Sequence, residues 1–84
     1  MKRYGYVFYR NYQRFIRKFY FFENALDSFI SDFDYNRAYG IGVYDKEANI
    51  LYLPSYFNKE QQKWAIEEVK KLGYEVRKIQ IFGL

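Results

Sequence analysis

Residues 10–19, RNYQRFIRKF, place four cations among three aromatic residues and one isoleucine, without any acid. Arginine and lysine neutralise phosphate groups, and aromatic rings stack on unpaired bases. This combination therefore predicts contact with an anionic partner. The residues expected to make that contact are Arg10, Tyr12, Arg14, Arg17 and Lys18, joined by Tyr6, Tyr52 and Lys78 from other strands.

The charges are unevenly distributed along the chain. Residues 1–22 carry six bases and no acid, residues 23–34 carry four acids and no base, and the formal net charge is +4. Such asymmetry indicates an anionic partner for the first segment. The alternative is that the basic and acidic segments pair with each other in the fold, and the sequence leaves both interpretations open.

The chain has few of the side chains that usually carry out catalysis. The chain has no histidine and no cysteine, so it lacks an imidazole base, a thiolate nucleophile and a thiolate zinc site. Asp32 and Asp34 could hold Mg²⁺ through oxygen ligands, but pairing with the nearby basic segment is the simpler interpretation. We therefore expect no enzyme, no metal and no cofactor.

The basic segment is predicted to form the second strand of a β-hairpin. Residues 4–9, YGYVFY, and 14–20, RFIRKFY, consist largely of β-prone residues, and Asn11 can adopt the left-handed conformation that a tight turn requires. A competing interpretation makes residues 12–33 one long helix, because aromatic residues also recur there at helical spacing. The aromatic density lowers helix propensity, which favours the hairpin.

The rest of the chain divides into clear elements. An apolar stripe at residues 25–33 predicts an amphipathic helix, with Asn24 and Asp27 as its capping box. Residues 39–54 predict a second hairpin with Asn49 in its loop. Asn58 and Gln61 form another capping-box pattern, which begins a helix that ends at Gly73. Residues 75–82 alternate as a strand does.

These elements give one α+β domain over residues 1–84 in the order ββα-ββα-β. It divides into two ββα units, residues 4–34 and 39–72, followed by the strand 75–82. We expect a two-layer sandwich, with both helices on one face of a mostly antiparallel sheet. The alternative is a ferredoxin-like βαββαβ order, if residues 12–34 are helical.

Aromatic residues are in surplus for such a sandwich. The chain has 11 Tyr, 9 Phe and 1 Trp, and its strands carry apolar residues at successive positions rather than alternate ones. Two helices on one face cannot cover both sides of the sheet, so an open face of rings and cations is expected. This predicts a small non-catalytic module that binds nucleic acid or a nucleoprotein complex.

The alternative function is a protein-binding inhibitor or adaptor. Compact, cofactor-free chains of this size are common among phage and mobile-element proteins that block a host machine by surface contact. A homodimer is compatible with either function. No apolar run approaches the roughly 20 residues that span a bilayer, so a cytoplasmic protein without a membrane partner is expected. Nothing in the sequence indicates a small-molecule substrate.

Overall fold

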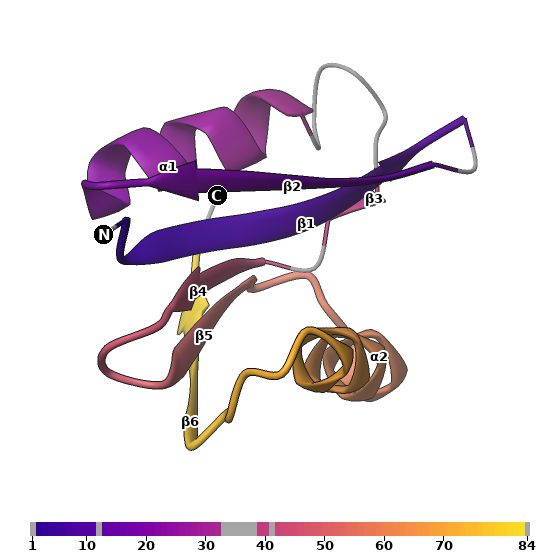
Figure 1. The fold of residues 1–84 in the computed structure, drawn as a ribbon. Coiled ribbons are helices and arrows are strands. Elements are labelled where there is room, and N and C mark those ends of the chain that lie inside the picture. Colours follow the sequence, from indigo (N-terminus) through magenta and orange to yellow (C-terminus); the bar gives the residue numbers. More distant parts are fainter. Residues whose placement is uncertain (1, 12, 33–38, 41, 84) are drawn as a thin grey trace.

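The computed structural model describes residues 2–11, 13–32, 39–40 and 42–83 (Figure 1). Its elements are β1 (Tyr4–Arg10), β2 (Gln13–Phe19), α1 (Phe22–Ile30), β3 (Tyr39–Gly40), β4 (Val43–Asp45), β5 (Ile50–Pro54), α2 (Lys59–Lys71) and β6 (Lys78–Phe82). Because β3 and β4 together occupy the place of one strand, the α+β class and the order ββα-ββα-β are confirmed. In the described part of the chain, no helix is long and apolar enough to cross a membrane.

The strands form one sheet in the order β2-β1-β4-β5-β6, with β3 paired to β1 beside β4. Neighbouring strands are antiparallel except for β5 and β6, which are parallel. The mostly antiparallel sheet is therefore confirmed. The ferredoxin-like alternative is wrong, because residues 13–19 form a strand and not a helix.

Local turn and cap chemistry was predicted correctly at several positions. Asn11 and Asn49 have φ values of 51° and 58°, and Gly73 follows α2 with a φ of 86°. The Asn58 side chain accepts a hydrogen bond from the Gln61 backbone amide at 2.8 Å, while the Gln61 side chain accepts one from the Asn58 amide at 2.9 Å. These contacts fix the turns and the start of α2 from neighbouring residues alone.

The start of α1 differs from the prediction. The helix begins at Phe22, after an extended Phe21 that makes no side-chain cap, so Asn24 lies within the first turn and the predicted capping box is wrong. The Phe22 ring packs against Tyr4 and Tyr52, with ring centres 5.6 and 4.7 Å apart. Tertiary packing of an aromatic ring, rather than a polar cap, accompanies the start of this helix.

A bulge separates β3 from β4. Two residues lie between Gly5 and Phe8 on β1, whereas three lie between their partners Tyr44 and Gly40 on the neighbouring strand. Gly42 sits in this stretch with a φ of 96°, and a Cβ there would lie 2.4 Å from a backbone oxygen of β5. The strand therefore requires glycine at this position.

The two helices lie on opposite faces of the sheet (Figure 1). One buried cluster lies between the sheet and α1: Tyr6, Phe8, Ala25, Phe29 and Val43. The other lies between the sheet and α2: Val7, Tyr44, Leu51, Leu53, Phe57, Ala65 and Val69. The expected two-layer sandwich with both helices on one face is therefore wrong. Strands with apolar residues at successive positions are buried on both sides, as in other sheets covered twice.

Candidate functional site

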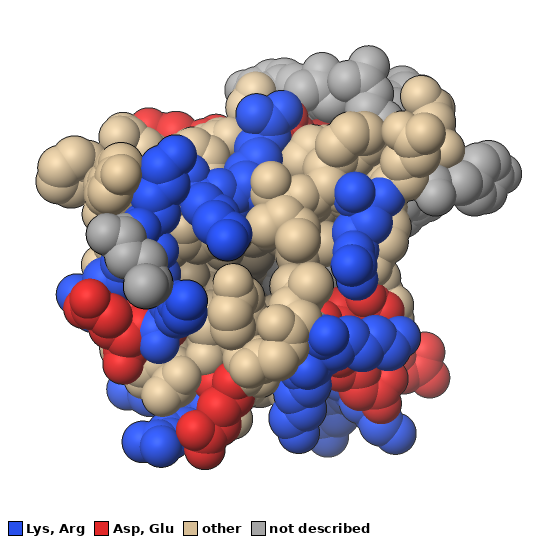
Figure 2. Space-filling model, viewed as in Figure 1, with Lys and Arg blue, Asp and Glu red and all other residues tan. Residues whose placement is uncertain are grey.

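A hollow of about 280 Å³ opens on the α2 side of the sheet, between β1, β2, β4 and the end of α2 (Figure 2). Its position follows from the strand register. Lys18 on β2 pairs with Gly5 on β1, and Gly5 pairs with Tyr44 on β4. The middle position of this row has no side chain, so the sheet surface is bare between the lysine and the tyrosine. We call this site the hollow.

The interior of the hollow is largely apolar. Its walls include Val7, Ile16, Val69 and Leu72, and Gly5 contributes backbone to its lining. The helix α2 ends at Lys71, beside the hollow, and covers the neighbouring part of this face. Because the helix does not extend over the hollow, one side of the hollow is open to solvent. The apolar interior can accept a flat or compact apolar group.

Two stacked tyrosines form one wall. The rings of Tyr44 and Tyr74 are nearly parallel, with centres 4.9 Å apart. The Tyr44 hydroxyl hydrogen-bonds to the Asn49 side chain at 2.8 Å and donates to the Glu75 carbonyl. Burial, followed by the nearby Glu75 charge, raises the pKa of Tyr44. The wall is therefore held in place before any ligand arrives.

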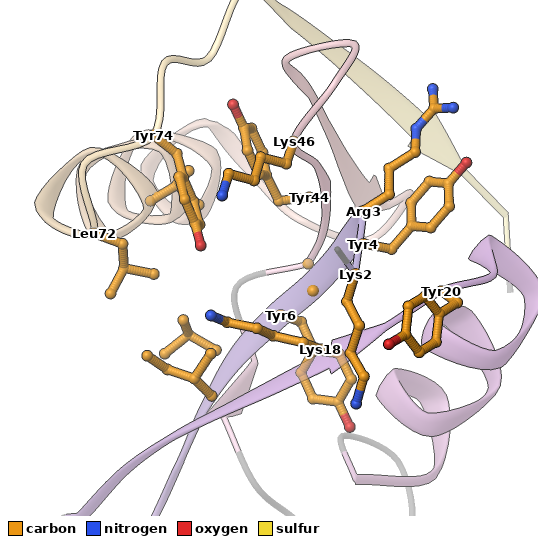
Figure 3. Close-up of a pocket in the computed structure, with 15 residues that line it drawn as sticks. Lys2, Arg3, Tyr4, Tyr6, Lys18, Tyr20, Tyr44, Lys46, Leu72 and Tyr74 are labelled. Carbon is orange, nitrogen blue, oxygen red and sulfur yellow. The ribbon is translucent and has the colours of Figure 1, made fainter.

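Cations surround the opening. Lys2, Lys18 and Lys46 reach it from three different segments, and no Asp or Glu is among the described residues that line it (Figure 3). The Lys2 and Lys46 amines lie 5.5 and 5.8 Å from the ring centres of Tyr20 and Tyr74. Neither Lys2 nor Lys18 forms an ion pair with another described residue. The rim is therefore suited to an anionic group.

The fourth cation of the lining, Arg3, forms an ion pair with Asp45. Its Nε lies 2.7 Å from one carboxylate oxygen of Asp45, and its second terminal nitrogen lies 2.8 Å from the other. Burial alone would raise the pKa of Asp45, but hydrogen bonds from Arg3 and from the amides of Glu47 and Ala48 outweigh it and lower that pKa. Arg3 thus fastens the N-terminal segment to the turn after β4 and shapes the rim.

The basic residues predicted on β2 are divided between the two faces, because side chains alternate along a strand. Lys18 lines the hollow, and Arg14 lies on the same side near Glu68. Arg17 points to the α1 side, where its Nε lies 3.0 Å from Asp32. This pair confirms, for Arg17, the alternative in which the acidic segment neutralises the basic one.

None of the other predicted site residues in the described part of the chain presents an exposed side chain to the hollow. Tyr6 is among its lining residues, but the ring is buried beneath α1, where its hydroxyl bonds to Asp32 and Ser28, and Tyr52 packs there against Phe22. Their expected placement on an open aromatic face is wrong, because α1 covers that face. Lys78 is exposed on β6 at the opposite edge of the sheet. The Arg10 side chain and Tyr12 lie outside the described residues.

Sequence reasoning missed most of the hollow. Lys2, Tyr20, Lys46 and Tyr74 line it from segments far apart in the chain, and only the sheet register brings them together. The one local signal was Gly5, a residue without a side chain inside a run of β-prone residues.

The hollow offers cationic donors and apolar contact. Its described lining contains no carboxylate, imidazole or thiol, and no group of three or more potential metal ligands lies together in the described part of the chain. The geometry is therefore suited to binding an amphipathic anion. The chain matches no family model, no curated protein and no solved structure.

Proposed function

We propose that the protein is a non-catalytic module that binds single-stranded nucleic acid, free or within a nucleoprotein complex, through the surface around the hollow. The observation that carries this proposal is an apolar hollow rimmed by Lys2, Lys18 and Lys46, without an acidic residue in its described lining. We place the protein in the cytoplasm. Thiols are kept reduced there, and a chain without cysteine does not depend on a disulfide for its stability.

Exposed rings beside the lysines favour a single strand over a duplex. Tyr20 and Phe21 follow β2 and are 61% and 67% exposed, and Tyr20 and Tyr74 line the hollow together with the lysines. A duplex presents phosphates but keeps its bases paired and stacked, whereas the bases of a single strand are free to stack on aromatic side chains. Cations and rings on one surface therefore fit a strand with unpaired bases.

The proposal is tested by titrating the protein into a fluorescently labelled single-stranded oligonucleotide at several salt concentrations. Three lysines that neutralise phosphates predict a log–log slope of about −2, from about −0.7 for each contact. Salt-independent or absent binding at low salt would overturn the proposal.

A matched pair of variants locates the surface. Lys18 and Lys78 are both exposed lysines on edge strands, but only Lys18 lines the hollow. Lys18→Glu and Lys78→Glu change the net charge equally, so any difference reports position. We expect Lys18→Glu to weaken oligonucleotide binding about tenfold or more and Lys78→Glu to weaken it about twofold or less. Equal losses would contradict the proposed surface.

The open edge of β2 favours a second candidate, a protein-binding inhibitor or adaptor of the phage or mobile-element type. β2 ends the sheet, and its residues from Gln13 to Lys18 are exposed, so a partner strand could add to it. Its cations oppose pairing with a second copy and favour an acidic segment.

The second candidate predicts no oligonucleotide binding at low salt. It also predicts a cellular protein that co-purifies with the wild type but not with Ile16→Pro, since proline removes an amide hydrogen and is tolerated at a sheet edge. Circular dichroism verifies that the variant is folded. Unchanged co-purification with folded Ile16→Pro would exclude the β2 edge as the contact.

A further inference from the structure

We propose that the hollow binds one nucleoside monophosphate unit, with the heterocyclic base inside the cavity and the phosphate at the lysine rim. The inference rests on the proposed function, because it names which part of a nucleic acid enters the site. The same chemistry is present in a nucleotide of a single strand and in a free mononucleotide, so the test must separate these two sources.

The size of the hollow limits its occupant to a single nucleotide. Its volume of about 280 Å³ lies just below the range of small-molecule sites, which run from about 300 to 1,000 Å³. One base with part of its sugar fills such a space, whereas a stacked run of bases does not fit. The remaining nucleotides of a strand would then lie outside, along β2.

The interior fits the base rather than the phosphate. Val7, Ile16, Val69 and Leu72 provide apolar contact, and the absence of a side chain at Gly5 lets a flat ring approach the sheet. A phosphate placed at that depth would lose its water against apolar groups. The flat ring system is the part of a nucleotide that gains from this environment.

The rim fits the phosphate. In Figure 3 the Lys46 amine lies beside Tyr74, the Lys18 side chain crosses the hollow below it, and the Lys2 amine lies on another side, next to Tyr20. Amines at different points of the rim can donate charge-assisted hydrogen bonds to the phosphate of a bound nucleotide.

The end of α2 does not oppose this arrangement strongly. Backbone carbonyls at a helix C-terminus carry partial negative charge, which repels anions. Here the Val69 carbonyl accepts hydrogen bonds from the Leu72 and Tyr74 amides, and the Lys70 carbonyl accepts one from Gly73. These carbonyls already have donors, which lessens their repulsion of an anion at the rim.

The first experiment is an NMR titration of the ¹⁵N-labelled protein with adenosine 5′-monophosphate and, separately, with ribose 5-phosphate. The two ligands share a phosphate and a sugar but differ in the base. We expect saturable shifts at the amides of Gly5, Val7 and Lys18, and affinity about tenfold higher for the nucleotide. Equal affinities, or shifts confined to other strands, would overturn the inference.

Matched variants then test the interior wall. Ile16 and Ile81 are 49% and 47% exposed on the two edge strands, but only Ile16 lines the hollow. We expect Ile16→Ala to reduce the preference for the nucleotide over ribose 5-phosphate by about threefold, and Ile81→Ala to leave it unchanged. Lys18→Gln should weaken both ligands by the same factor. A preference insensitive to Ile16→Ala would place the base elsewhere and overturn the inference.

Failure of this inference is distinguishable from failure of the proposed function. Oligonucleotide binding without mononucleotide binding, or without base preference, overturns the one-nucleotide site and leaves nucleic-acid binding standing. Mononucleotide binding with base preference but no oligonucleotide binding supports the site, identifies the ligand as a free nucleotide and overturns the proposed function. If neither ligand binds, both proposals are overturned.

Discussion

The two faces of the sheet are covered to different extents, although the longer helix lies on the less complete side. On the α1 face, neighbouring strands present rings that touch: Tyr6 stacks on Phe19 at 5.9 Å, and Phe8 stacks on Phe15 at 5.1 Å. On the α2 face, the corresponding row has Gly5 at its centre. Coverage is therefore decided by the side chains that the sheet itself presents, not by the length of the helix above it.

The charges on the two faces differ in the same way. Arg17 and Lys18 are adjacent on β2 but point to opposite sides. Arg17 pairs with Asp32 at 3.0 Å, and its guanidinium lies 5.1 Å from the centre of the Phe8 ring. Lys18 has no ion pair with a described residue and lines the hollow. On the α1 face the β2 cation is paired within the protein, whereas on the α2 face the β2 cation lies where a ligand could bind.

The largest effect is expected from removing a ring that is buried between the sheet and α1. Phe29 is a residue of α1 that is fully buried against the sheet, and it makes edge contacts with Tyr6 and Phe82 at 5.6 and 6.4 Å. Phe29→Ala should lower the free energy of unfolding by about 3–5 kcal/mol, a large share of the total for a small domain. Urea unfolding followed by circular dichroism measures this loss.

Leu72→Ala is the matching substitution on the α2 face, where the hollow lies. Leu72 is partly buried at the wall of the hollow, and its removal enlarges a space that is already open to solvent. We expect a loss of only about 1 kcal/mol. Similar losses for Phe29→Ala and Leu72→Ala would show that the two faces are equally well packed in solution.

An intermediate effect is expected at the ion pair that joins Arg3 in the N-terminal segment to Asp45 at the end of β4. The pKa of Asp45 is lowered in the folded protein, so this carboxylate stabilises the fold above the unfolded value of about 3.9. The contribution is lost as the pH falls through the lower, folded pKa. Asp45→Asn should cost about 2 kcal/mol at neutral pH, where its hydrogen bonds from Arg3 are weakened.

The control for this prediction is the pH profile itself. Between about pH 5 and pH 2, wild-type stability should fall more steeply than that of Asp45→Asn, because the variant has no charge to lose at this position. Urea unfolding at each pH value measures both curves. Parallel curves would mean that Asp45 does not carry the acid dependence.

The elements of the fold were predictable because their signals are local. Asn11, Asn49 and Gly73 adopt positive φ where the sequence predicts turns, and the Asn58–Gln61 box begins α2. Such features depend on residues a few positions apart. The face on which each helix packs depends instead on distant contacts, which no local pattern records.

The same apolar run supported two interpretations. Residues 4–9, YGYVFY, place apolar side chains on both sides of a strand, which fits either an open aromatic face or a sheet covered twice. The structure has the second arrangement, so Tyr6 and Tyr52 pack beneath α1. Of the residues that line the hollow, the sequence supplied Tyr6 and Lys18 but not Lys2 or Lys46, because the position of these two lysines at the rim follows from the fold and not from spacing.

The smallest expected effect sharpens the comparison between the helices that cover the two faces. Asn58 caps α2 through two hydrogen bonds, so Asn58→Ala should cost about 1 kcal/mol. Asn24 is exposed in the first turn of α1 and caps nothing, so Asn24→Ala should leave stability unchanged or raise it by a few tenths of a kcal/mol, since alanine favours helix. Urea unfolding measures both variants. A comparable loss for Asn24→Ala would mean that a polar cap stabilises the start of α1 in solution. If only Asn58→Ala is destabilising, the packing of the Phe22 ring is what holds the start of α1 against the sheet.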